Sequence, residues 1–146
     1  RGKMIHLLTW YLILAAPGGS TDSFCRVHGE SRYPSIRHAE FFSNSAVGYG
    51  GSTPMQVREL RCILSRPDAS DVLDGLIKHA TLAGQLFILA GIYLIDTDRF
   101  ERVARPHARD KRTVKTVYGC IESEAKVASV IDEMRKGNLP RELGGP

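Results

Sequence analysis

The residues with the clearest chemical potential are seven basic side chains that fall within residues 99–115. Only Glu101 and Asp110 oppose them in sequence, so this stretch carries an excess of five positive charges. Clustered arginine can hold phosphate or carboxylate groups through two hydrogen bonds at once. A solvated helix face and loop is the alternative interpretation of such a charge run. The candidate partner-binding residues are Arg99, Arg102, Arg105, Arg109, Lys111, Arg112 and Lys115.

Cysteine and histidine come close together at Cys25 and His28, whose spacing could supply two metal ligands. A zinc site needs three or four, and no second cluster of cysteines or histidines follows in the sequence. The sequence also lacks a GxSxG or HExxH motif and a Cys–His pair within a recognisable catalytic signature. We therefore expect no metal, no cofactor and no catalytic residue, although a catalytic site assembled only by the fold would be invisible at this level.

Two further stretches resemble ligand-binding motifs. The glycine-rich residues 48–53 lead into a predicted helix, which is a geometry that can hold an anion. No lysine stands in the Walker position and no apolar strand precedes the glycines, so we interpret them as a connector. Residues 79–95 have the spacing of a helix-turn-helix, but the helix that would read DNA has hardly any polar side chain. Nucleic acid is therefore not the partner that we expect.

The elements that must position these residues surround one apolar run. Leu82–Ile95 contains fourteen residues without a charge. A membrane-spanning helix needs about 20 apolar residues, and a run of 10–14 usually forms a buried core helix. We therefore predict a helix at the centre of the fold, with Thr81 as its N-cap.

Periodic apolar residues and capping signals divide the rest of the chain. Residues 53–56 have the pattern of a capping box that begins the first helix. Asp96 or Thr97 is predicted to cap the fourth. The last helix is predicted over about residues 123–136, and residues 113–120 are rich in β-branched side chains that are typical of a short strand.

These elements predict an all-α fold, a small bundle or short solenoid of about five helices, with the Leu82–Ile95 helix central. We expect residues 1–18 to be a separate apolar segment and residues 19–53 to be an irregular segment rich in glycine and serine. Residues 54–137 would form the helical domain. Residues 138–146 would form a loose tail.

The sequence AGQLFILAGIYLID, set among short paired helices, resembles α-solenoids of the HEAT type over about residues 54–108. In that family, alanines, glycines and leucines let successive helices approach closely. The resemblance implies a protein-binding scaffold without catalytic residues. It transfers no site residue to this chain.

Residues 1–18 have the three parts of a secretory signal peptide, namely a basic start, an apolar run and a small-residue exit. If Met4 is the true start, the basic part is lost, and a buried first strand or helix is the alternative. We expect a secreted or cell-envelope protein that meets a membrane only transiently through this segment. The cytoplasm is the alternative compartment.

Whether the three cysteines form a disulfide depends on the compartment. Export would allow one disulfide among Cys25, Cys62 and Cys120 and would leave one free thiol, and the spacing does not say which pair forms. In the cytosol, Cys62 would instead be a small core residue on an apolar helix face.

Composition sets the broad class. The 146 residues, 42% hydrophobic and 25% charged, are enough for one globular domain with a core, and the formal net charge of +4 is mild. We predict a non-catalytic helical interaction module that binds a protein or other anionic partner through the basic stretch. One alternative is a hydrolase-like enzyme with a site between residues 19–53 and the helices. A second is nucleic-acid binding through the residues 99–115.

Overall fold

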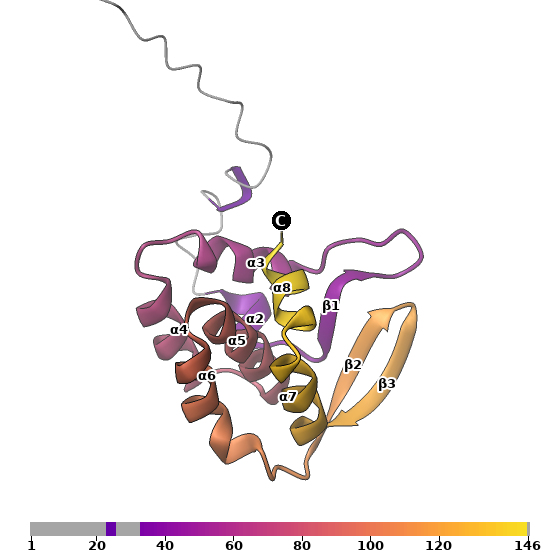
Figure 1. Cartoon of the computed structure of the whole chain (residues 1–146). Coiled ribbons are helices and arrows are strands. Elements are labelled where there is room, and N and C mark those ends of the chain that lie inside the picture. Colours follow the sequence, from indigo (N-terminus) through magenta and orange to yellow (C-terminus); the bar gives the residue numbers. More distant parts are fainter. Residues whose placement is uncertain (1–22, 26–32, 146) are drawn as a thin grey trace, which may run out of the picture.

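The computed structural model describes residues 23–25 and 33–145, and the predicted signal peptide lies outside them. The fold is α/β, so the prediction of an all-α bundle is wrong: helices pack beside a three-stranded mixed sheet (Figure 1). The helices are α2 (Pro34–Arg37), α3 (Met55–Leu64), α4 (Ala69–Ile77), α5 (Leu82–Ile95), α6 (Thr97–Ala104), the 3₁₀ helix η1 (Arg105–His107), α7 (Val127–Arg135) and α8 (Asn138–Gly144). The strands are β1 (Phe42–Val47), β2 (Thr113–Gly119) and β3 (Ile121–Lys126).

Helix α5 forms the core, as the apolar run predicts. Nine of its 14 residues are buried. A helix that is apolar on every side needs neighbours on every side, and α5 contacts each of the helices α2, α3, α4, α6, α7 and α8 and the strands β1 and β2. Thr81 caps it, because its Oγ1 accepts the Gly84 N–H at 3.1 Å. Among the described helices, none is long and apolar enough to span a membrane.

Two glycines let other helices approach α5 closely. A Cβ added at Gly84 would overlap the carbonyl oxygen of Ile36 in α2. A Cβ added at Gly91 would lie 2.8 Å from Leu60 Cδ1 of α3. The contact at Gly84 is with a backbone atom, so that position accepts only a hydrogen, whereas at Gly91 the Leu60 side chain would have to shift. Helices α2 and α3 therefore lie directly on α5.

The helix starts are partly as predicted. Asp96 caps α6, since its Oδ1 accepts the Arg99 N–H at 3.0 Å. The capping box at residues 53–56 is wrong, because Pro54 occupies the N-cap of α3 and no side chain caps it. Instead the buried Glu59 of α3 accepts the backbone N–H of Ile36 at 2.9 Å, which ties the start of α2 to α3.

The sheet has the order β1-β2-β3, with β1 parallel to β2 and β2 antiparallel to β3. On β1, Phe42 is fully buried against the Phe87 ring of α5, with the ring centroids 4.8 Å apart. The predicted strand at residues 113–120 is β2. The helix predicted over about residues 123–136 is α7, which begins only at Val127, because the residues before it pair with β2 as β3.

The C-terminal residues are ordered where the sequence predicts a loose tail. Residues 138–144 form α8, which packs against α3 and α5. Leu143 is fully buried, and Arg61 of α3 donates from Nε to its carbonyl oxygen at 3.0 Å. Figure 1 shows α7 and α8 on the side of the helices where the strands lie, and α8 also contacts β1.

Candidate partner-binding surface

Four of the seven predicted basic residues form one group on α6, η1 and the loop that follows. Arg102 lies on α6, Arg105 begins η1, and Arg109 and Lys111 lie in the loop. All four side chains are exposed. None has a carboxylate partner within 4.0 Å in the described part of the chain. We call these four residues the basic surface.

Arg99 does not belong to this surface. Its guanidinium pairs with the carboxylate of Asp74 and donates to the hydroxyl of Ser70, both on α4, and its side chain is only 18% exposed. Its charge is therefore used inside the molecule, where it joins α6 to α4.

Asp110 organises the loop that carries the basic surface. Its carboxylate accepts the Arg112 backbone N–H at 2.9 Å and the Arg112 Nη2 at 2.6 Å, and His107 Nδ1 lies 3.7 Å away. The hydrogen bonds from Arg112 hold the pKa of Asp110 well below its usual range, and the same pairing raises the pKa of Arg112. This loop is thus fixed by its one carboxylate, with Arg109 and Lys111 exposed.

Lys115, the last predicted site residue, lies on another face. It sits on β2 directly opposite Glu124 of β3 and lines a hollow of about 760 Å³ over the sheet. The structure therefore separates the predicted set: four residues form the basic surface, Arg99 and Arg112 are paired internally, and Lys115 belongs to the sheet.

The alternative of an enzyme would place a His, Cys or carboxylate from residues 25–53 against one from the helices. Glu40 lines the hollow over the sheet, where its neighbours come from strands and turns. A second hollow, of about 430 Å³, joins His38 and Glu40 to Met55 and Gln56 of α3. Neither hollow brings a His, Cys or carboxylate from residues 25–53 against such a group on a helix. Within the described residues, no group of three or more His, Cys, Asp or Glu side chains could hold a metal ion.

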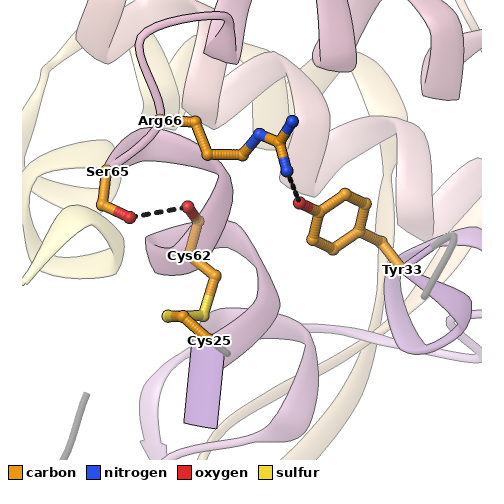
Figure 2. Close-up of a disulfide and its surroundings, with 5 residues drawn as sticks. All are labelled: Cys25, Tyr33, Cys62, Ser65 and Arg66. Atoms are coloured by element: carbon orange, nitrogen blue, oxygen red, sulfur yellow. Dashed lines mark hydrogen bonds between the residues drawn. A yellow bond between two sulfur atoms is a disulfide. The ribbon is translucent and has the colours of Figure 1, made fainter. Parts of the chain in front are cut away.

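The cysteine pairing was not predictable from spacing. Cys25 and Cys62 form a disulfide across 37 positions, and Cys120 is free and exposed. Figure 2 shows Cys25 held against α3, where the Ser65 hydroxyl donates to the Cys62 carbonyl oxygen at 2.8 Å. The Arg58 guanidinium also lies 5.7 Å from the Phe24 ring centroid, so this contact and the disulfide both attach residues 23–25 to α3.

Replacing both bridged cysteines, Cys25→Ser with Cys62→Ser, should lower the free energy of unfolding by about 2–4 kcal/mol, because the denatured chain regains the freedom of a closed loop. For a chain of this size, that corresponds to a fall in Tm of roughly 4–16 °C in circular dichroism. The control Cys120→Ser should melt like the wild type, since this thiol is exposed and unpaired. An unchanged Tm in the double variant would contradict the pairing.

Comparison with known proteins adds no further constraint. No family model, curated protein or solved structure matches the chain. The resemblance to HEAT-type helix pairs stays a prediction.

Proposed function

We propose that this chain is a non-catalytic interaction domain that binds an acidic segment of a partner protein through the basic surface. The main support for the proposal is that some arginines pair with carboxylates of the same chain and others do not. Arg99, Arg112 and Arg135 all hold carboxylates, whereas Arg102 and Arg105, together with the other members of the basic surface, hold none in the described structure. Exposed guanidinium groups without a partner are available to carboxylates of another molecule.

A protein partner fits this surface better than a nucleic acid. Asp98 and Glu101 are exposed on the same helix as Arg102, so negative charge interrupts the surface. A phosphate backbone that tracks along the helix would meet these carboxylates. An acidic peptide can place its side chains at the arginines alone.

The disulfide supports an exported or envelope location for this interaction. Disulfides form and persist mainly in oxidising compartments and are rare in the cytosol. The Cys25–Cys62 bridge joins two different parts of the chain, as a structural bridge does.

The test replaces three cations of the basic surface, in the variant Arg102→Gln, Arg105→Gln and Arg109→Gln. We expect affinity for a fluorescent glutamate-rich peptide, measured by anisotropy at low salt, to fall about tenfold, because each exposed ion pair contributes about 0.2–1 kcal/mol. Tm should stay within about 2 °C, since none of these side chains is buried.

The matched control removes three other exposed charges, Arg58→Gln on α3, Lys78→Gln directly after α4 and Arg141→Gln on α8. It has the same net charge as the test variant and should bind within about twofold of the wild type. Equal losses of affinity in the two variants would mean that binding depends on net charge alone, which would contradict a specific basic surface. Tighter binding of a DNA duplex than of the acidic peptide, with a steep salt dependence, would favour the nucleic-acid alternative instead.

A further inference from the structure

Strand β3 is an edge strand. It pairs with β2 on one side, and no strand within the described residues pairs with the other side. Its side chains are exposed along almost the whole strand, and Ile121 at its start is 70% exposed. In Figure 1, β3 is the strand farthest from α5. An open edge presents unpaired backbone N–H and C=O groups that can accept another strand.

The two faces of β3 differ in chemistry. Register with β2 places Glu122 opposite Val117 and Glu124 opposite Lys115, and all four line the hollow over the sheet. The other face carries Ile121 and the residues that alternate with the glutamates. A strand added at this edge would therefore meet carboxylates on one side and an exposed isoleucine on the other.

The hollow has an excess of negative charge. Glu40 joins Glu122 and Glu124 in its lining, against Lys115 as the one cation there. No ion pair involving these three carboxylates is present in the described part of the chain, even though Lys115 and Glu124 are cross-strand neighbours. Their charge is thus available to a ligand.

We propose that β3 accepts an extended segment of a partner protein as a fourth strand, with basic side chains at alternate positions of that segment. The backbone of the segment would pair with the open edge. Its basic side chains would reach into the hollow toward Glu122 and Glu124, and its alternate, apolar side chains would cover Ile121. This surface takes a partner of opposite charge to the one proposed for the basic surface.

A second copy of this chain is a poorer occupant. Two antiparallel copies of β3 would bring Glu122 and Glu124 of each copy close to those of the other, and like charges opposite each other destabilise a strand pair. The same carboxylates that discourage self-pairing attract a basic strand. Charge therefore selects the occupant of this edge.

The experiment titrates the full chain with a short, end-blocked peptide of alternating lysine and valine. The expected result is binding, with slower backbone hydrogen exchange at residues 121–126. The variant Glu122→Lys with Glu124→Lys should lose at least about tenfold in affinity, because two attractions become repulsions. The control Asp71→Lys with Asp98→Lys changes the net charge equally on α4 and α6 and should keep the affinity within about twofold.

Two further peptides separate strand pairing from simple charge attraction. Methylation of the valine backbone nitrogens removes donors but keeps every charge, and it should abolish binding. Replacement of lysine by glutamate should also abolish binding. The proposal is overturned if the wild type does not bind the lysine peptide, if the methylated peptide binds equally well, or if both charge variants lose affinity equally.

Discussion

Leu89→Lys is expected to abolish cooperative folding. Leu89 is fully buried in α5, the helix that contacts every other α-helix from α2 to α8. An ammonium group placed there would lie within the apolar core, and the buried carboxylate of Glu59 on α3 already accepts the Ile36 N–H. Its desolvation costs several kcal/mol in addition to the lost leucine packing. Because natural domains are stable by only about 5–15 kcal/mol, this one change is comparable to the whole free energy of unfolding.

Ile95→Lys is the matched control, since it makes an apolar-to-lysine change on the same helix. Ile95 is the last residue of α5 and is 43% exposed. A lysine there can reach solvent, and its charge is favourable at a helix C-terminus. Urea denaturation followed by circular dichroism should show a shift of about 0.5 kcal/mol or less for Ile95→Lys and no cooperative transition for Leu89→Lys. A wild-type midpoint for Leu89→Lys would refute the central position of α5.

The sequence predicts α5 and its neighbours well because their signals are local. The charge-free run, Thr81 before it and Asp96 after it are close together in the chain, and the structure uses each of them as predicted. Helical periodicity is likewise a property of adjacent turns. Helices α3 to α6 were accordingly predictable from the residues that form them. Helices α2 and α8, which also pack on α5, were not, because they lie in the segments expected to be irregular and a loose tail.

The sheet was not predictable in the same way. Strand β1, FSNSAV, has only Phe42 as a large apolar residue, and β3, IESEAK, is made mostly of polar residues and good helix formers. Both become strands because β2 lies between them and supplies hydrogen bonds to each. Strand preference depends on such pairing more than on intrinsic propensity. The sequence therefore predicts the start of a helix at about residue 123, where the structure has the second part of β3.

For the candidate site, too, the local features could be predicted from the sequence and the long-range contacts could not. An excess of basic residues at 99–115 is visible in the sequence, but which of these cations remain unpaired is not. Arg99 is neutralised by Asp74, 25 positions earlier, and Lys115 is carried to the sheet by β2. The Cys25–Cys62 bridge is equally long-range. Only the fold decides which charges and thiols are available to a partner.

Gly84→Ala should destabilise the protein by about 3 kcal/mol or more. In an isolated helix the same change is favourable by about 1 kcal/mol, because alanine has the higher helix propensity. Here the added methyl group overlaps the carbonyl oxygen of Ile36, a backbone atom that cannot rotate away. Relief requires α2 to move off α5, which would disturb the Glu59 hydrogen bond to the Ile36 N–H. Overpacking of this kind exceeds the gain in propensity.

Gly75→Ala separates the two contributions, because it adds the same methyl group to a helix with open space around it. Gly75 lies within α4, is exposed, and has no atom within 4 Å of an added Cβ. Its substitution should raise the free energy of unfolding by about 0.5–1 kcal/mol through helix propensity and a less flexible denatured chain. Urea denaturation of the two variants should therefore give shifts of opposite sign. If Gly84→Ala were stabilising as well, helix propensity alone would govern both sites, and α2 could not lie on α5 at Gly84.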